Sequence, residues 1–378
     1  MLHLVLLSVN LYQAILVYIM ARSKLFRFFP IPEYIVMPSF GLEISERTVK
    51  YVEMKDTPEG LIVNHYGIEH IPDGAIQKGI VVDSTKLLPI LTTIRKNKKV
   101  EAVCVSIPEE QVYTFQQEIE LIPGVEIRDS ILLNIEGYIP VPADTVEFDY
   151  DVISTNGNRV KIQVAAVERN VVESYIEVCN NAGMQVVACE YECQALARAL
   201  TKPGGTSVVY IIDIGHASTT ASVVQNGIVV SSSTIMRGGE EITLAISKAL
   251  NIPNEEAEII KHKIGMNGKD KYVQLPEILS QAYLPLFTEI IDQYNAWLTY
   301  VKTRETTYHP IDSIQIVGTE ALTPGFMDLL QASFHKTVVL ANVWTRVETV
   351  STRVPLINFK DSLIYGTAIG LALGAFEV

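Results

Sequence analysis

The residues best suited to chemistry lie within residues 208–224, where a carboxylate is followed by a glycine and hydroxyl side chains. β-Branched apolar residues lead to Asp213 and resume after the turn, which predicts a β-hairpin. Gly215 lets the backbone approach a ligand, and Ser218 and Thr219 bring hydroxyl groups to the same turn. A carboxylate at the end of a buried strand can hold a metal ion through water. Alone, this pattern is more typical of an ordinary hairpin than of a phosphate-binding loop.

Residues 40–53 repeat this pattern of an apolar strand, an acidic residue, a polar turn and a second strand. The aligned pairs are Glu43 with Asp213, Ser45 with Gly215, and Thr48 with Ser218. Two acidic hairpins in one chain predict two related halves that face each other across a nucleotide. The two stretches resemble the two phosphate loops of the actin-like ATPase superfamily.

Two glycines, Gly238 and Gly239, open another predicted helix. They could bring backbone N–H groups against a phosphate or sugar, with the helix dipole adding to the attraction. They could equally form only a tight turn. In the next predicted helix, residues 254–263, Glu258 and Lys261 lie on one face, and we expect a solvent-exposed pair.

The composition is that of a folded globular protein, with 378 residues of which 48% are hydrophobic and 19% charged. This length allows two domains with apolar cores. The net charge of −13 and the lack of a block rich in Lys or Arg argue against nucleic-acid binding. The four cysteines lack the spacing of a zinc site or a disulfide framework, so we expect buried, reduced thiols. They are Cys104, Cys179, Cys189 and Cys193.

Residues 1–20 are mostly apolar and are followed by three basic residues before residue 28. The run is barely long enough to cross a bilayer, and the basic residues behind it would keep the bulk of the chain in the cytoplasm. The alternative, which we favour slightly, is a start at Met20. Residues 20–29 would then be a basic, aromatic leader able to touch an anionic membrane surface.

Strands and helices alternate along the rest of the chain. We expect a helix over residues 84–96 with Ser84 as its N-terminal cap, and a long amphipathic helix over residues 276–303. Residues 108–184 carry strands and helices in the order of a small inserted α+β subdomain. The sequence therefore predicts an α/β protein with an insertion.

Four stretches together resemble the PilM family of type IV pilus assembly proteins, relatives of the division protein FtsA. They are Gly41-Leu42-Glu43-Ile44 with Val49-Lys50-Tyr51-Val52-Glu53, Glu136-Gly137-Tyr138-Ile139-Pro140-Val141-Pro142, Asp213-Ile214-Gly215 with Thr219, and Ala257-Glu258-Ile259-Ile260-Lys261 with Gly265. The resemblance covers nearly the whole chain from about Phe40, and the second stretch is the most specific to PilM. It implies an α/β fold of the actin-like (ribonuclease H-like) type, with two domains and an inserted α+β subdomain, 1C.

The family's order of subdomains divides this chain into eight segments. They are a leader at 1–37, subdomain 1A at 38–107, the inserted 1C at 108–184, a return to 1A at 185–205, subdomain 2A at 206–245, subdomain 2B at 246–308, a return to 2A at 309–357, and a C-terminal helix at 358–378 that closes 1A.

The resemblance also implies ATP and Mg²⁺ in a central cleft. Glu43 and Asp213 would hold Mg²⁺ through water. The residues expected around the nucleotide are Gly41, Ser45, Lys50, Asp213, Gly215, Ser218 and Thr219 near the phosphates, and Gly238, Gly239, Glu258, Lys261 and Gly318 near ribose and adenine. Glu190 is the candidate for orienting the attacking water.

Two positions depart from the family's pattern. Ser45 stands where the first loop usually has glycine, which puts a side chain where backbone would approach phosphate. Thr319 follows Gly318 where a second glycine is usual. Either departure could weaken or reshape nucleotide binding, and neither abolishes it.

By this resemblance the chain is expected to be a cytoplasmic, ATP-binding scaffold of type IV pilus assembly, peripheral to the inner face of the cytoplasmic membrane. Its expected partners are the cytoplasmic N-terminal tail of a PilN-like inner-membrane protein, held near the groove between 1A and 1C, other pilus assembly proteins and further copies of itself. ATP would act mainly as a conformational ligand, with at most slow hydrolysis.

Other functions stay open. A nucleotide-free adaptor, as in the actin-like cytoplasmic part of the secretion protein GspL, fits Ser45 and Thr319. The Asp213 turn and the helix with Glu258 and Lys261 favour ATP instead. A small-molecule kinase would need a catalytic aspartate in a loop after the first hairpin, and the sequence offers none. A division role like that of FtsA is expected less, because no amphipathic membrane helix follows the core before Val378.

Overall fold

The computed structural model describes residues 39–58, 60–202, 204–304, 310–347 and 354–376. The predicted leader, with its alternatives of a membrane span and a start at Met20, lies outside these residues. Among the helices that are described, none combines the length and apolar character needed to cross a bilayer.

The described chain forms two compact units. Unit 1 holds the chain up to Ala199 and takes back short segments that begin at Val347 and Thr367. Unit 2 runs from Leu200 to Arg346 and includes Ile357–Gly366. The finer division into four subdomains stays a prediction.

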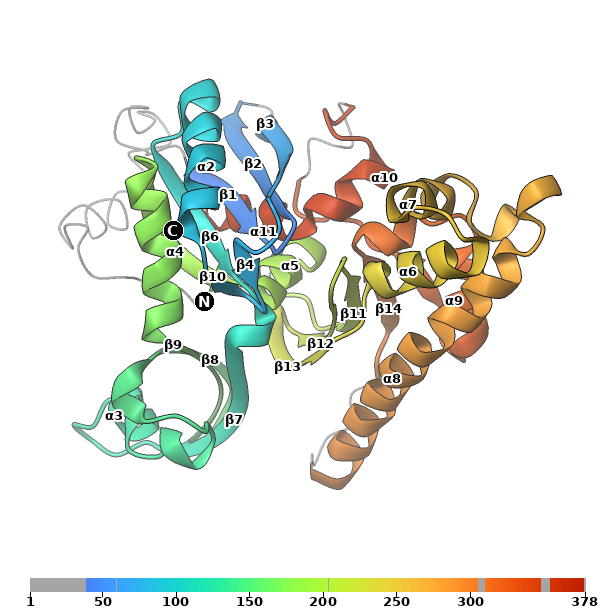
Figure 1. The fold of residues 1–378 in the computed structure, drawn as a ribbon. Coiled ribbons are helices and arrows are strands. Elements are labelled where there is room, and N and C mark those ends of the chain that lie inside the picture. The colour runs from blue at the N-terminus through green and yellow to red at the C-terminus, as the bar shows by residue number, and fades with distance from the viewer. Residues whose placement is uncertain (1–38, 59, 203, 305–309, 348–353, 377–378) are drawn as a thin grey trace. The chain divides into compact units, whose positions relative to one another are not determined.

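The core of unit 1 is a five-stranded sheet in the order β3-β2-β1-β6-β10 (Figure 1). Its strands are β1 (Ser39–Ile44), β2 (Thr48–Thr57), β3 (Gly60–His70), β6 (Ala102–Ile107) and β10 (Gln185–Tyr191). The first three strands pair antiparallel, whereas β6 and β10 run parallel to β1. A separate short hairpin joins β4 (Ile76–Gln77) and β5 (Ile80–Val81).

The core of unit 2 is a second five-stranded sheet, in the order β13-β12-β11-β14-β15. Its strands are β11 (Val208–Ile214), β12 (Thr219–Gln225), β13 (Ile228–Ile235), β14 (Ser313–Val317) and β15 (Val338–Leu340). Three antiparallel strands are again followed by two parallel ones. The two sheets therefore share one topology, which confirms the prediction of two related halves.

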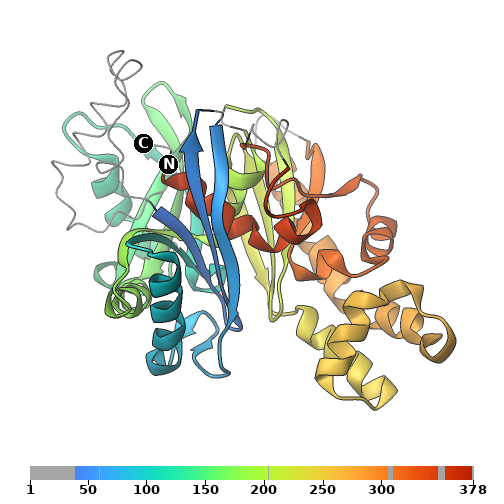
Figure 2. The same ribbon diagram turned by 90° about the horizontal axis from the view of Figure 1, so that it is seen from above.

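Helices cover both faces of the unit 1 sheet. On one face, α2 (Ser84–Lys98) and α4 (Arg169–Asn181) contribute apolar residues to the main core. On the other, α5 (Glu192–Leu200) and α11 (Gly366–Gly374) pack closely, with Ala195 and Leu371 against Cys104. Figure 2 shows α11, in red, beside the blue strands of this sheet.

The cap of α2 differs from the prediction. Helix α2 begins at Ser84, but the capping side chain is that of Asp83, whose carboxylate accepts a hydrogen bond from the Thr85 backbone N–H at 3.1 Å. The Ser84 prediction placed the cap one residue too late, because an Ncap residue lies just outside the helix and bonds the second amide after it.

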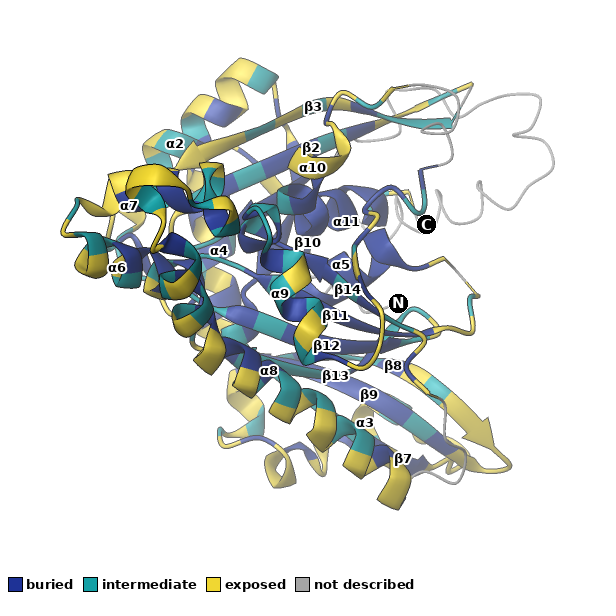
Figure 3. Ribbon diagram, turned by 90° about the vertical axis from the view of Figure 1, so that its right-hand side faces the viewer, coloured by how far each residue is buried: buried dark blue, intermediate teal, exposed yellow. Residues whose placement is uncertain are grey.

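Unit 2 is mainly helical outside its sheet. Its helices are α6 (Gly239–Leu250), α7 (Asn254–Lys263), the predicted long helix α8 (Leu275–Arg304), α9 (Phe326–Ser333) and α10 (Phe359–Ser362). α8 is anchored to the sheet, since the Tyr210 hydroxyl donates to the Ile290 carbonyl at 3.2 Å. Exposed residues gather on α6 and α7 and along the outer side of α8 (Figure 3).

The predicted insertion builds its own small module within unit 1. We call it the inserted module, made of β7 (Val112–Glu120), α3 (Ile127–Leu132), β8 (Val146–Asn156) and β9 (Arg159–Glu168). The strands form a sheet in the order β7-β9-β8. One face of this sheet packs against Ile131 and Ile135 in a separate apolar core.

The four cysteines are free and buried, as the sequence predicts. Burial raises the pKa of Cys189 to about 12, with a smaller contribution from the charge of Glu190. Burial also raises the pKa values of Cys104 and Cys179. At neutral pH these thiols stay protonated and behave as small apolar core residues.

Candidate functional site

The two acidic turns have the same geometry. In unit 1, the Ser45 N–H donates to the Thr48 carbonyl at 2.9 Å, and in unit 2 the Gly215 N–H donates to the Ser218 carbonyl at 3.0 Å. The strands on either side pair in equivalent registers. The alignment expected from the sequence is therefore correct residue by residue.

The first turn carries a partly buried ion pair. Lys50 stands directly opposite Glu43 across β1 and β2, and Lys50 Nζ lies 2.5 Å from Glu43 Oε1. The Ser45 hydroxyl donates to the Thr48 carbonyl at 3.1 Å and accepts from the Thr48 N–H at 3.3 Å. The serine that departs from the family's glycine thus closes its own turn.

Two other predicted site residues of unit 1 have packing partners. A Cβ on Gly41 would lie 2.0 Å from the Ala368 carbonyl oxygen, so glycine lets β1 approach α11. The Glu190 carboxylate is enclosed and pairs with the Arg198 guanidinium at 2.6 Å. These contacts account for both residue types without a ligand, and their assignment to nucleotide or water stays a prediction.

The second turn, between β11 and β12 of unit 2, lies beside the end of β14, where Gly318 follows. Gly318 has φ +91°, and a Cβ there would lie 2.6 Å from Asp213 Oδ1 and 2.3 Å from the Ile214 carbonyl oxygen. Only glycine fits this conformation and this space. The hydroxyl of Thr219 is turned away from solvent and donates to the Arg237 carbonyl at 2.8 Å.

The start of α6 is fastened to the second turn. The Gly239 N–H donates to the Gly215 carbonyl at 3.0 Å, and the Glu240 N–H donates to the His216 carbonyl at 2.8 Å. A Cβ on Gly238 would lie 2.5 Å from the His216 carbonyl oxygen. The glycine pair therefore allows the turn and the helix to meet, and two of the helix's first amides are already bonded.

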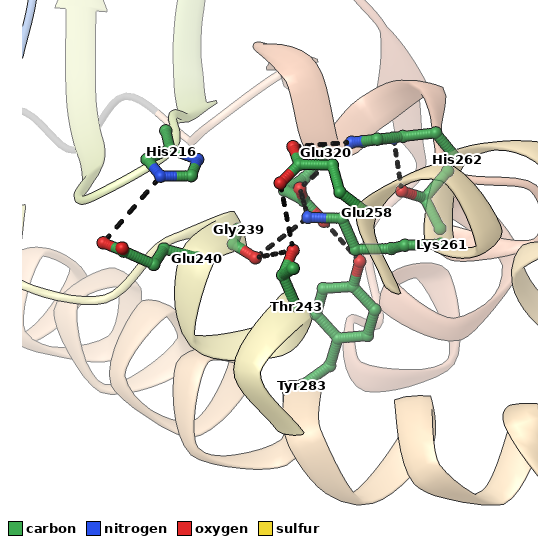
Figure 4. Close-up of polar contacts among 10 residues, drawn as sticks. His216, Gly239, Glu240, Thr243, Glu258, Lys261, His262, Tyr283 and Glu320 are labelled. Atoms are coloured by element: carbon green, nitrogen blue, oxygen red, sulfur yellow. Dashed lines mark hydrogen bonds and ion pairs between the residues drawn. The ribbon is translucent and has the colours of Figure 1, made fainter. Parts of the chain in front are cut away.

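Lys261 is a buried cation at the centre of this region (Figure 4). Its side chain is 0% exposed, and Nζ lies 2.6 Å from Glu320 Oε1 and 2.9 Å from the Gly239 carbonyl oxygen. The Tyr283 hydroxyl donates to the other oxygen of Glu320 at 2.5 Å. The expectation of a solvent-exposed Glu258–Lys261 pair is wrong, because Lys261 turns inward to a carboxylate 59 residues away.

Glu258, by contrast, keeps an accessible carboxylate. Its side chain is 42% exposed, and Oε1 lies 3.7 Å from His262 Nε2. The other carboxylate oxygen, Oε2, accepts a hydrogen bond from the Thr243 hydroxyl at 3.4 Å. The His262 contact, followed by the charge of Lys261, lowers the pKa of Glu258 to about 2. Glu258 is therefore an ionised acceptor across the physiological pH range.

The structure groups the predicted residues of each unit but adds two that the sequence did not indicate. In unit 2, Asp213, Gly318, the turn, the start of α6 and α7 form one neighbourhood, and Glu320 and Tyr283 join it. Glu320 directly follows Thr319, and no local spacing links it to Lys261. Within the described ranges, no cluster of three or more His, Cys, Asp or Glu side chains is arranged to hold a metal ion.

The family model of the type IV pilus assembly protein PilM matches residues 41–376. A solved PilM–PilN type IV pilus biogenesis complex is similar at TM-score 0.73 and 19% identity, over 91% of this chain and 100% of that chain. An MreB protein of Spiroplasma citri bound to ADP is similar at TM-score 0.54 and 14% identity, over 92% and 97%.

Cell division protein FtsA of Bacillus subtilis is 27% identical over 239 residues, which cover 57% of this chain and 54% of FtsA. The chain thus spans about half the length of that curated relative. The solved structures show an actin-like ATPase fold, as the resemblance implied. With a family match over most of its length, the chain belongs to the type IV pilus assembly protein PilM family.

Proposed function

We propose that this protein is an ATP-binding scaffold of type IV pilus assembly that works at the cytoplasmic face of the inner membrane. ATP acts mainly as a conformational ligand, and a PilN-like inner-membrane protein supplies its cytoplasmic N-terminal tail as partner. The observation that carries the proposal is the acidic turn built twice, at the same place in two sheets of one topology.

The residues of unit 2 fit the chemistry of a nucleotide. Asp213 would hold Mg²⁺ through water, a mode that suits this strongly hydrated cation, and Mg²⁺ would supply positive charge against the phosphates. Glu258 is ionised and half-exposed, so it can accept hydrogen bonds from the two ribose hydroxyls. Gly318 leaves room beside Asp213 where any side chain would stand.

Calorimetric titration of ATP with Mg²⁺ tests this part of the proposal. We expect micromolar-range binding that is lost in Asp213→Ala and weakened in Glu258→Gln. Asp328→Ala, which removes an exposed carboxylate on α9, is the matched control and should bind as wild type does. Binding that survives Asp213→Ala unchanged would refute the assignment of the second turn.

A nucleotide-free adaptor is the second candidate, and one set of contacts favours it. The first two amides of α6 are bonded to the turn, and Lys261 is paired with Glu320. Both groups would be unavailable to a phosphate. Absence of ATP binding in wild type, with an intact complex with the PilN-like tail, would establish this alternative.

The site proposed for the tail lies where the inserted module meets the end of β10. Gln163 of β9 stands directly opposite Asp151 of β8, so the two side chains share one face of the sheet. Gln163 is 1% exposed, and its Oε1 atom has no hydrogen-bond partner among the described residues. Such an acceptor is costly when it stays unsatisfied.

Tyr191 connects this face to β10. Burial raises the pKa of its hydroxyl well above the usual value, and the nearby carboxylates of Glu109 and Asp151 raise it further. The hydroxyl is also without a hydrogen-bond partner in the described part of the chain. The region between this face and β10 therefore holds several oxygen atoms that can accept hydrogen bonds. This supports binding of a peptide whose N–H groups donate to them.

Fluorescence polarisation with a labelled peptide of the PilN-like cytoplasmic tail tests this site. Gln163→Leu keeps the size of the side chain and removes the acceptor, so we expect at least tenfold weaker binding of the tail. Gln315→Leu, on β14 of unit 2, should leave tail binding unchanged. Equal binding by wild type and Gln163→Leu would place the tail elsewhere.

A further inference from the structure

The inserted module exposes an unusual number of large apolar side chains in one short segment. Between β7 and β8, residues 121–138 contain six exposed apolar side chains, with exposed fractions from 39% to 84%. They are Leu121, Ile122, Val125, Leu132, Leu133 and Tyr138. Single exposed apolar residues are ordinary, but six within 18 residues indicate a surface that another molecule covers. We call this set the α3 patch.

The α3 patch lies on the opposite side of the inserted module from the sheet face that carries Gln163. Ile162 and Val164 of β9 belong to the core that α3 covers, and Gln163, which lies between them, faces the other way. The two residues after the buried Ile131 are exposed: Leu132, the last residue of α3, is 48% exposed, and Leu133, just beyond the helix, is 84% exposed. The patch is therefore separate from the site proposed for the PilN-like tail.

The backbone near each end of the segment is open. Among the described residues, a Cβ on Gly124 or Gly137 would meet nothing within 4 Å. At these two points no other described part of unit 1 stands in the way of a partner.

The charge around the patch is negative on balance. Glu126, Asp129 and Glu136 are exposed, and in the described part of the chain none of the three forms an ion pair with a basic side chain. The one cation of the segment, Arg128, is exposed as well. Its guanidinium is engaged with Phe148: Nη1 donates to the Phe148 carbonyl at 3.1 Å, and the guanidinium carbon lies 4.3 Å from the centre of that ring. The segment thus presents three exposed carboxylates against one cation, and the charge of the rim is negative on balance.

We propose that the α3 patch is a docking surface for a basic, amphipathic segment of a partner protein. Its leucines and isoleucine take the apolar face of that segment, and the carboxylates of the rim take its Lys and Arg side chains. An anionic lipid surface would be repelled by this rim. A second copy of the chain, docked through the same patch by two-fold symmetry, would set carboxylates against carboxylates.

The test uses the full-length protein and a fluorescein-labelled amphipathic peptide of about 18 leucine and lysine residues. A counterpart with glutamate at every lysine serves as the peptide control. The informative variant is Leu133→Glu, because it removes an apolar contact while it adds negative charge. A contact that is only electrostatic would become stronger, whereas the proposed contact becomes at least tenfold weaker.

Two further variants complete the design. Glu126→Lys should weaken binding several-fold and reduce its dependence on salt. Leu284→Glu, a matched change of an exposed leucine on α8, should bind the basic peptide as wild type does. Leu133→Glu should bind the PilN-like tail as wild type does. Failure of the α3 patch proposal can therefore be distinguished from failure of the proposed tail site.

Several outcomes would overturn the proposal. Equal binding of the basic and acidic peptides, or wild-type affinity in Leu133→Glu, would show that the patch takes no basic amphipathic segment. Light scattering that finds a dimer dissolved by Leu133→Glu would assign the patch to a second copy. Co-sedimentation with phosphatidylglycerol vesicles that Leu133→Glu abolishes would assign it to lipid.

Discussion

Replacing Lys261 by methionine tests the buried ion pair most directly, because the length of the side chain is kept and its charge is lost. Lys261 and Glu320 are 0% and 1% exposed, and their charged atoms are 2.6 Å apart. The change leaves a buried carboxylate without its cation, and removing one partner of a buried ion pair costs about 3–5 kcal/mol. We therefore expect Lys261→Met to lower the free energy of unfolding of unit 2 by about that amount.

The chain's own fluorescence reports this unit. Both tryptophans, Trp297 and Trp344, lie in unit 2, so urea or thermal unfolding followed by tryptophan emission measures its stability. For a unit of this size each kcal/mol shifts Tm by about 2–4 °C, so the expected loss is about 10 °C. Lys248→Met, on the exposed side of α6, is the control and should change stability by no more than about 0.5 kcal/mol.

A second substitution decides whether the pair is coupled. Adding Glu320→Gln to Lys261→Met removes the uncompensated charge, so about 1–3 kcal/mol of the loss should be recovered. Losses that simply add in the double variant would mean that the two side chains do not interact. A cost below about 1 kcal/mol for Lys261→Met would refute the reasoning as well.

Three further changes have distinct expected results. Lowering the pKa of Glu258 from 4.5 to about 2 corresponds to about 3 kcal/mol, which solvent screening of a side chain 42% exposed reduces to about 1 kcal/mol. Glu258→Gln should therefore cost about 1 kcal/mol at pH 7, and the difference should vanish as the pH falls from 4.5 toward 2 in urea titrations. Tyr283→Phe removes a hydrogen bond to a buried carboxylate and should cost about 1.5–3 kcal/mol by the same fluorescence assay. Gly370→Ala puts a Cβ 1.7 Å from the Ala195 carbonyl oxygen and should destabilise unit 1 by about 1–3 kcal/mol or more in circular dichroism, whereas Gly137→Ala, with open space around it, should be near neutral.

The fold was largely predictable because its signals are local. Each acidic turn is bounded by two β-branched strands, and this pattern specifies the hairpin, its register and its repetition. The long helix α8 follows from apolar periodicity alone. The cap of α2 was misassigned by one residue, since Asp83 and Ser84 are both good capping residues and only the backbone geometry distinguishes them.

The candidate site was predictable only in part, for a physical reason. The motifs identify Glu258 and Lys261 on one helix, but they do not indicate which of the two is buried. A buried lysine requires a partner, and Glu320 comes from a turn after β14 that the sequence separates from α7 by the whole of α8. No spacing rule links residues whose proximity depends on the packing of three elements.

The glycine pair shows how one residue type can serve a purpose other than the one its motif indicates. Gly238 and Gly239 were candidates for opening the start of α6 to a phosphate. In the structure, the space that side chains would need is taken by the His216 carbonyl on one side and the Glu320 carboxylate on the other. The first two amides of α6 bond the second turn. Any phosphate bound in unit 2 therefore depends on the amides and hydroxyls of the turn itself, and α6 contributes by holding that turn in place and through its dipole.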